Sequence, residues 1–129
     1  MRYFARPILV LVAASLSGCV TAQQYNDDGS IDAKLGQTVR FGSMKVTPFK
    51  VLEDSRCPME ARCVWAGRLN LRVRINVGGS DQFGEVSTDK PFQVRAGTLE
   101  LQGVMPPRSV QRTLVPSDYR FTLKFSGGL

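Results

Sequence analysis

The clearest pattern in the chain is a strict alternation of apolar and polar side chains between residues 68 and 77. Successive side chains of a β-strand point to opposite faces of the sheet, so this alternation predicts a strand with one face on a core and the other in water. A similar alternation covers residues 119–125. Together the two segments favour an antiparallel sheet with one solvated face. The apolar positions of the first segment are Leu69, Leu71, Val73, Ile75 and Val77, and its basic positions are Arg68, Arg72 and Arg74.

Shorter alternating segments predict further strands, and no stretch of the chain shows a helical period. We expect these strands at residues 38–41, 44–47, 49–52, 82–86, 92–95 and 99–102. Turn-forming residues separate them at intervals of about ten residues, while the proline-rich residues 104–116 are expected to form an irregular crossover. The sequence therefore predicts an all-β fold: a single small antiparallel β-sandwich or barrel-like domain of about seven or eight strands, spanning residues 37–129.

The environment of the only tryptophan follows from the same alternation. If the strand at 68–77 is continued backwards through Gly67, both Trp65 and Cys63 fall on its apolar face. We therefore expect Trp65 to pack in the core rather than to serve as an exposed platform for a ligand. Gly67 itself is a candidate position for a β-bulge.

The first residues of the chain have the pattern of an export signal. Arg2 and Arg6 precede an apolar run at residues 8–14, and small residues follow it. A basic start, a short apolar segment and small residues before a cleavage point are typical of a secretory signal peptide. The apolar run is too short to cross a bilayer as a helix.

The end of this segment, Leu16-Ser17-Gly18-Cys19, resembles the lipobox of bacterial lipoproteins. The resemblance implies that residues 1–18 are a signal peptide cut off before Cys19, whose thiol carries lipid (palmitate among the acyl chains). Residue 20 is valine rather than the aspartate that retains such proteins at the inner membrane, which implies an outer-membrane, periplasm-facing location. The polar residues 19–36 are interpreted as a lipidated, flexible tether. A plain secreted protein is the alternative.

The cysteine count leads to a disulfide prediction. The chain has three cysteines, and lipidation of Cys19 leaves Cys57 and Cys63. An oxidising compartment favours their pairing. Their spacing differs from the C-x-x-C pairs of zinc ribbons and thioredoxin-like enzymes. We therefore expect a structural disulfide.

Two short segments around these cysteines also carry a resemblance. Asp54-Ser55-Arg56-Cys57-Pro58 and Cys63-Val64-Trp65-Ala66-Gly67 resemble a motif of small uncharacterised bacterial envelope proteins, many of which have signal peptides. This resemblance implies no particular activity. Physically, we interpret the motif as a structural crosslink that combines a turn at Asp54, a disulfide and an aromatic side chain that fills space in the core.

Composition narrows the function classes. Histidine is absent, which removes the usual acid–base side chain and the commonest zinc ligand. We expect no metal and no cofactor. The formal net charge of +6 falls to about +4 when Arg2 and Arg6 are removed, because 15 basic and 11 acidic residues remain. This mild excess suits an anionic envelope component. An exported chain without a basic tract is not expected to bind nucleic acid.

Two groups of charged residues are candidate sites. Arg68, Arg72 and Arg74 share one strand face and could hold phosphate or carboxylate groups of an anionic partner, although an ordinary solvated face explains them as well. A second group of acidic residues could supply a general acid and base, as in glycosidases; capping and surface ion pairs are the simpler explanation. This second group consists of Glu53, Asp54 and Glu60.

The sequence thus predicts a lipid-anchored protein of the cell envelope that acts as a non-enzymatic binding or structural module. Its partners would be the membrane, through the N-terminal lipid, and an anionic envelope component or an envelope protein. One alternative is a carboxylate-dependent glycan hydrolase. Another is an inhibitor of a periplasmic hydrolase, although a basic domain is a poor match for cationic lysozymes.

Overall fold

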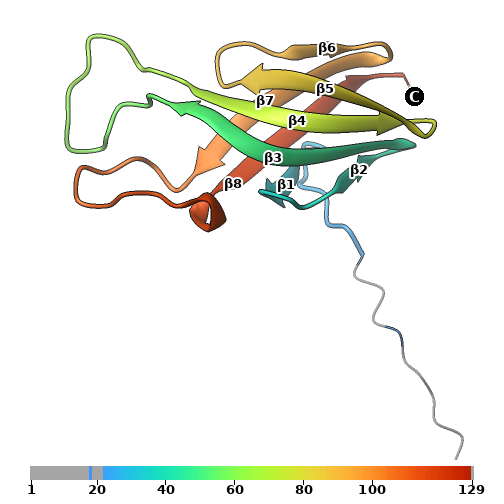
Figure 1. The fold of residues 1–129 in the computed structure, drawn as a ribbon, viewed down its shortest axis with the longest axis horizontal. Coiled ribbons are helices and arrows are strands. Elements are labelled where there is room, and N and C mark those ends of the chain that lie inside the picture. Colours follow the sequence, from blue (N-terminus) through green and yellow to red (C-terminus); the bar gives the residue numbers. More distant parts are fainter. Residues whose placement is uncertain (1–17, 19–21, 129) are drawn as a thin grey trace, which may run out of the picture.

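The protein is a sandwich of two antiparallel four-stranded sheets (Figure 1). The computed structural model describes residue 18 and residues 22–128. One sheet has the strand order β1-β8-β7-β6 and the other β2-β3-β4-β5, which confirms the predicted all-β class. The described strands are β1 (Ile31–Lys34), β2 (Val39–Phe41), β3 (Met44–Asp54), β4 (Leu69–Val77), β5 (Ser80–Ser87), β6 (Phe92–Val94), β7 (Gly97–Met105) and β8 (Arg120–Gly127), with a short 3-10 helix, η1, at Pro116–Asp118.

The core lies between the two sheets and is built from the alternating strands. In β4, the side chains of Leu69, Leu71, Val73 and Ile75 are fully buried, and Phe121 of β8 is buried on the other sheet. Complete burial of one such side chain contributes about 1.5–3 kcal/mol. The apolar alternation of β4 and β8 therefore marks the two central faces of the sandwich.

The folded domain begins before residue 37, which corrects the predicted extent of the tether. Residues 31–34 form β1, which pairs with β8 through Ile31↔Leu123 and Ala33↔Phe121, and both Ile31 and Ala33 are buried. The segment was expected to be flexible because only two of its side chains are apolar, too few to show a period. Pairing with the apolar strand β8 is sufficient to order it.

The position of Trp65 also differs from the prediction. β4 begins at Leu69, and the residues before it leave the sandwich as a loop. Trp65 is 59% exposed and Cys63 is exposed as well, so the expected core position of Trp65 is wrong. Gly67 marks the point where the alternation ends, because its φ of +68° is not that of an extended strand.

β3 is one long strand rather than two. Its 11 residues pair with β4 along their length, with register shifts after Pro48 and after Val51. A proline cannot donate a hydrogen bond to the ladder, so the shift beside Pro48 agrees with the predicted irregularity there. β3 connects the hairpin with β2 at one end of the molecule to a long loop at the other.

Candidate binding surface

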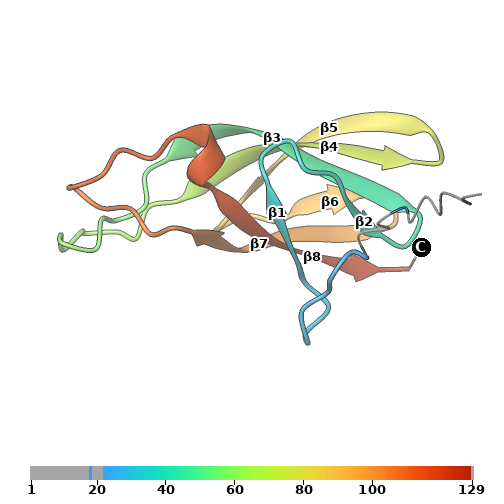
Figure 2. The same cartoon turned by 90° about the horizontal axis from the view of Figure 1, so that it is seen from below.

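Two long loops extend beyond the sandwich at one end (Figures 1 and 2). The first, residues 55–68, joins β3 to β4, and the second, residues 106–119, joins β7 to β8 and contains η1. Ordered loops longer than about 12 residues are uncommon in compact domains and are often functional. The side chains of these two loops are therefore candidates for a functional site.

The base of the first loop is closed by backbone contacts. The Ser55 amide donates to the Arg68 carbonyl over 2.8 Å, and the Cys57 amide donates to the Ala66 carbonyl over 3.1 Å. Gly67 lies so close to Ser55 that a Cβ there would come within 1.8 Å of the Ser55 carbonyl oxygen. Only glycine fits this close approach. The base of the loop is therefore narrow and fixed.

The predicted disulfide lies within this loop. Cys57 and Cys63 are bonded, with their Cα atoms 5.9 Å apart. The bridge closes the chain around residues 58–62, and it is placed at the surface because Cys63 is exposed. It therefore restrains the loop and does not support the core.

Asp54 anchors the start of the loop through three hydrogen bonds. Its carboxylate accepts from Nε and Nη2 of Arg56 at 2.8 and 2.9 Å, and from the Tyr119 hydroxyl at 2.9 Å. Burial raises the pKa of the Asp54 carboxyl, but the bonds from Arg56 and Tyr119 outweigh it and hold this pKa below its ordinary value. Burial, followed by the bond to Asp54, raises the pKa of Tyr119 to about 12. Asp54 is thus a charged structural group.

Arg56 and Arg108 tie the two loops to each other. Nη1 of Arg56 donates to the carbonyls of Val104 and Pro106 at 3.2 and 3.1 Å. In return, Nη1 of Arg108 donates to the Arg56 carbonyl at 2.9 Å, and the Met59 amide donates to the Arg108 carbonyl at 2.9 Å. Guanidinium groups that satisfy backbone carbonyls fix loop geometry well, because the fork of donors is rigid.

Glu60 makes the outermost connection between the loops. Its carboxylate accepts one hydrogen bond from the Ser109 hydroxyl and another from the Val110 amide, the latter at 3.1 Å. These two bonds lower the pKa of Glu60, the Ser109 bond being the larger cause. The tips of both loops therefore hold a defined position relative to each other.

The three candidate carboxylates have separate partners. Glu53 accepts from Nε of Arg68 at 3.1 Å, while Asp54 and Glu60 are bound as described above. A cavity of about 490 Å³ lies beside the second loop, and Asp54 is the one carboxylate that lines it. A glycosidase requires two carboxylates facing one substrate. The described residues do not provide such a pair here.

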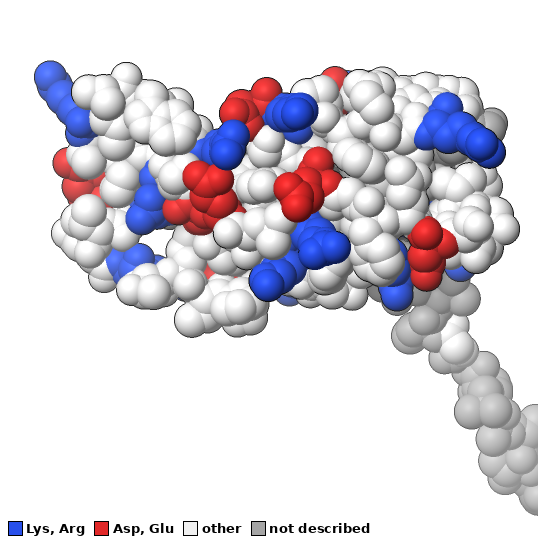
Figure 3. Space-filling model, turned by 45° about the horizontal axis from the view of Figure 1, so that its top comes forward, with Lys and Arg blue, Asp and Glu red and all other residues white. Residues whose placement is uncertain are grey.

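The loops present apolar side chains to solvent at their outer end, and we call Met59, Val64, Trp65 and Val110 the loop surface. All four are exposed, and Val64 is fully so. The two loops together carry five arginines and two acidic residues, a net charge of +3. Figure 3 shows basic and acidic side chains among uncharged atoms at this end. Sequence reasoning missed this surface, because the alternation assigned Trp65 to the core.

The three arginines of the predicted anionic-partner face lie in different environments. Arg68 pairs with Glu53 at 3.1 Å and Asp89 at 3.8 Å, and the bond to Glu53 is the main cause that raises its pKa. The Arg72 guanidinium lies 5.8 and 6.0 Å from the ring centres of Phe49 and Phe83. Arg74 makes no salt bridge with any described residue. The three arginines therefore do not form one common binding site.

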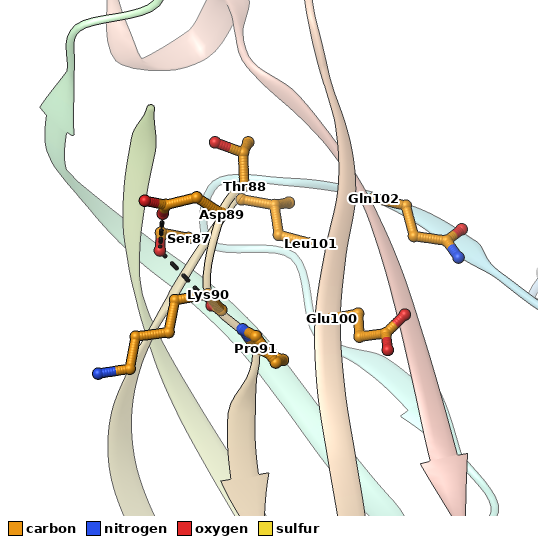
Figure 4. Close-up of a pocket in the computed structure, with 8 residues that line it drawn as sticks. All are labelled: Ser87, Thr88, Asp89, Lys90, Pro91, Glu100, Leu101 and Gln102. Carbon is orange, nitrogen blue, oxygen red and sulfur yellow. Dashed lines mark hydrogen bonds between the residues drawn. The ribbon is translucent and has the colours of Figure 1, made fainter. Parts of the chain in front are cut away.

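A further cavity, of about 440 Å³, lies beside the turn between β5 and β6 (Figure 4). The Ser87 hydroxyl donates to the Asp89 carboxylate over 2.7 Å. The side chains of Lys90 and Glu100 point in opposite directions. A ligand site needs a few polar groups that converge on the ligand, and this cavity does not have them.

The described residues hold neither a membrane-spanning helix nor a cluster of metal ligands. Residues 18 and 22–128 contain no helix long and apolar enough to cross a membrane. Within the same ranges, no three His, Cys, Asp or Glu side chains gather as a metal site requires. Comparison of the chain with models of protein families, with curated proteins and with solved structures finds no match.

Proposed function

We propose that the protein is a lipid-anchored component of the bacterial outer membrane that binds a partner protein through its two braced loops. The proposed role is non-enzymatic. The observation that carries it is the rigid presentation of an exposed apolar surface: contacts made by Asp54, Arg56, Glu60 and Arg108 fix the loops, while Trp65 and its neighbours remain exposed.

The anchor is supported by the sequence of the first twenty residues. Residues 1–17 and Cys19 lie outside the described residues, so the signal peptide and the lipidation remain proposals. The first described segment lies beside β2: Gln23 donates to the Arg40 carbonyl over 2.7 Å, and so does the Tyr25 hydroxyl. Since β2 pairs with the start of β3 and the first loop follows its end, a membrane anchor at Cys19 directs the loops away from the anchoring membrane.

The chemistry of the loop surface favours a protein with an acidic, concave face. Exposed tryptophan and methionine are typical anchors of protein interfaces. The loops carry a net charge of +3, and complementary charge accelerates the encounter and fixes orientation. Loops whose conformation is already fixed before binding lose little conformational entropy on association. This raises the affinity for a given buried interface area.

An inhibitor of a periplasmic hydrolase is a second candidate function. It is favoured by one observation, the bracing of two projecting loops by each other's backbone through Arg56 and Arg108. A pair of loops with a fixed conformation can enter an active-site cleft without the entropic cost of becoming ordered on binding. The inhibitor proposal differs from simple binding only in the nature of the partner.

Site-specific photocrosslinking in intact cells tests the proposed function. A photoreactive residue at Val64, on the loop surface, should capture a partner that the same residue at Ser80, an exposed position at the other end of the sandwich, does not capture. The purified partner should then bind the wild-type protein with a dissociation constant about 30-fold lower than that of Trp65→Ala, as for an interface hot spot. Loss of a hydrolytic activity of the partner on binding would establish the inhibitor function.

The control separates binding from folding. Because Trp65 makes no contribution to the core, Trp65→Ala should unfold at the wild-type temperature. Equal capture from Val64 and Ser80, or unchanged affinity of Trp65→Ala for the captured protein, would contradict the proposed function.

A further inference from the structure

A polar pocket of about 480 Å³ lies on the outer face of the β2-β3-β4-β5 sheet, at the end opposite the loops. Lys45 of β3 and Arg74 of β4 provide its positive charge. In the β3–β4 ladder Lys45 faces Asn76 and Thr47 faces Arg74, so the two cations are diagonal neighbours on adjacent strands, within reach of one ligand. The residues that line the pocket include Thr38, Lys45, Thr47, Arg74, Asn76 and Asp81.

The two cations of this pocket are free, whereas its acidic residue is bound. Among the described residues, neither Lys45 nor Arg74 takes part in a salt bridge or donates a side-chain hydrogen bond. The Asp81 carboxylate, by contrast, accepts from the Asn76 amide at 2.6 Å. The pocket therefore has two available cations against one carboxylate that already has a donor.

Hydroxyl groups complete the polar lining. The hydroxyls of Thr38 and Thr47 are 2.7 Å apart and bonded to each other. Either can turn its proton towards an incoming oxygen, because a hydroxyl both donates and accepts. A guanidinium, an ammonium and hydroxyls around one space are the groups that bind a phosphate: Arg can donate two parallel hydrogen bonds, and Lys adds a point charge.

We propose that this pocket binds a phosphate group, and that the lipid headgroups of the anchoring membrane supply it. The inference rests on the proposed lipid anchor. Arg40 faces Lys45 in the β2–β3 ladder, and its carbonyl holds Gln23 and Tyr25. The chain from Cys19 to Gln23 spans at most about 14 Å when fully extended. A lipidated Cys19 thus keeps Lys45 and Arg74 close to the headgroup layer.

The pocket also explains which of the predicted basic residues is free to bind an anion. Arg68 is paired with Glu53 and Asp89, and Arg72 packs against two phenylalanine rings. Arg74 has neither kind of partner among the described residues. The anionic group is therefore expected at one end of the strand and not across its whole face.

The first arm of the test uses inorganic phosphate as the probe. The protein purified from cells is titrated with phosphate at constant ionic strength, and its backbone amide signals are followed by NMR. We expect saturable shifts at residues 38–47 and 74–76, which Lys45→Gln/Arg74→Gln abolishes. The matched control is Lys34→Gln/Arg120→Gln, which removes two charges from a facing pair on the other sheet and should leave the shifts unchanged.

The second arm uses vesicles of phosphatidylcholine alone or with added phosphatidylglycerol. Acylation of lysines by a soluble reagent, read by mass spectrometry, reports their exposure in the vesicle-bound protein. Lys45 should react several-fold more slowly when phosphatidylglycerol is present, whereas Lys34 should not. Each cation removed from a membrane-facing site weakens attraction to anionic lipid about fivefold, so Arg74→Gln should restore much of the Lys45 reactivity.

The outcomes separate the pocket, its ligand and the loop function. Phosphate shifts together with lipid-dependent protection of Lys45 support the whole proposal. Phosphate shifts without protection overturn the lipid as the source and leave a site for free phosphate. If phosphate causes no amide shifts, or equal shifts in the two double variants, the proposal that this pocket binds phosphate is overturned. Because none of these results involves Trp65 or Val64, the proposed partner binding by the loops stands or fails separately.

Discussion

At the scale of single residues, Asp54 connects three parts of the chain. It ends β3, binds the guanidinium of Arg56 in the first loop and accepts from Tyr119, the residue before β8. Its side chain is 11% exposed, and a buried carboxylate without partners would be strongly unfavourable. The three hydrogen bonds make the ionised form the stable one. Asp54 is therefore expected to influence stability in a pH-dependent manner.

Asp54→Asn should change the pH dependence of unfolding. Because hydrogen bonds hold the pKa of Asp54 below its ordinary value of 3.8, its ionisation stabilises the fold above about pH 4, and this stabilisation is lost as the pH falls through the lowered pKa. At pH 7 we expect Asp54→Asn to lower the free energy of unfolding by about 1.5–3 kcal/mol. Urea unfolding at pH 7 and pH 3 measures both effects. The difference in the free energy of unfolding between wild type and Asp54→Asn should be smaller at pH 3 than at pH 7.

Unfolding at alkaline pH provides a control for the contact between Asp54 and Tyr119. The pKa of Tyr119 is raised from 10.0 to about 12. The protonated hydroxyl of Tyr119 therefore stabilises the fold below pH 10, and this stabilisation is lost between pH 10 and 12. Tyr119→Phe should abolish this part of the alkaline loss and retain the acidic one. Identical pH profiles for wild type, Asp54→Asn and Tyr119→Phe would contradict the assigned contact.

At the scale of elements, the long alternating strands were predictable, and so were the short edge strands β2 and β6, but the edge strand β1 was not. β4 and β8 alternate over enough residues to show their period. β1 has four residues and depends on β8 as its partner, which no local pattern reveals. The position of Trp65 was mispredicted because a single glycine with positive φ ends the alternation.

The candidate binding surface was less predictable than the fold. The disulfide followed from counting cysteines, but the contacts that brace the loops join residues about fifty positions apart, such as Arg56 with Pro106 and Glu60 with Ser109. Pairing of this kind depends on which strands become neighbours. The sequence shows the residues of the site, whereas their convergence is a property of the folded chain.

Removing the disulfide should loosen the first loop and lower stability moderately. For the ring closed by Cys57 and Cys63, the chain-entropy estimate gives a loss of about 2.4 kcal/mol in Cys57→Ser/Cys63→Ser. Chemical unfolding under oxidising conditions measures this difference. A reducing agent should lower the stability of the wild type to that of the variant and leave the variant unchanged. Equal stability of the oxidised wild type and the variant would contradict a bridging role.

At the scale of the whole molecule, the proposed functions lie at opposite ends. β3 has 11 residues, which corresponds to about 36 Å at the spacing of an extended strand. The proposed phosphate pocket is lined by Lys45 and Thr47, near the start of β3. The paired loops lie beyond the end of β3 (Figure 1). One strand thus sets the distance between the two ends that we propose to face the membrane and the partner protein.

Cys19→Ser should release the protein from membranes. Without the thiol there is no acylation site, and the remaining attraction of a few cations to anionic lipid is reversible. Fractionation of cell envelopes should find the wild type in the membrane fraction and Cys19→Ser outside it. Cys57→Ser/Cys63→Ser is the matched control and should stay with the membrane, while continued retention of Cys19→Ser would contradict the lipid anchor.

The pairing of β1 with β8 has a mechanical consequence. The chain enters β1 from the end near β2, and its four residues pair with Leu123, Thr122, Phe121 and Arg120 in turn. A load applied between an anchored N-terminus and a partner bound at the loops would pull on β1 at Ile31 and on β8 at Arg120, which lie at opposite ends of the paired segment. Such a load stretches the β1–β8 hydrogen bonds together, in shear, and does not open them one after another. If the N-terminus is anchored as proposed, the edge strand that follows it is thus oriented to resist detachment of the domain under tension.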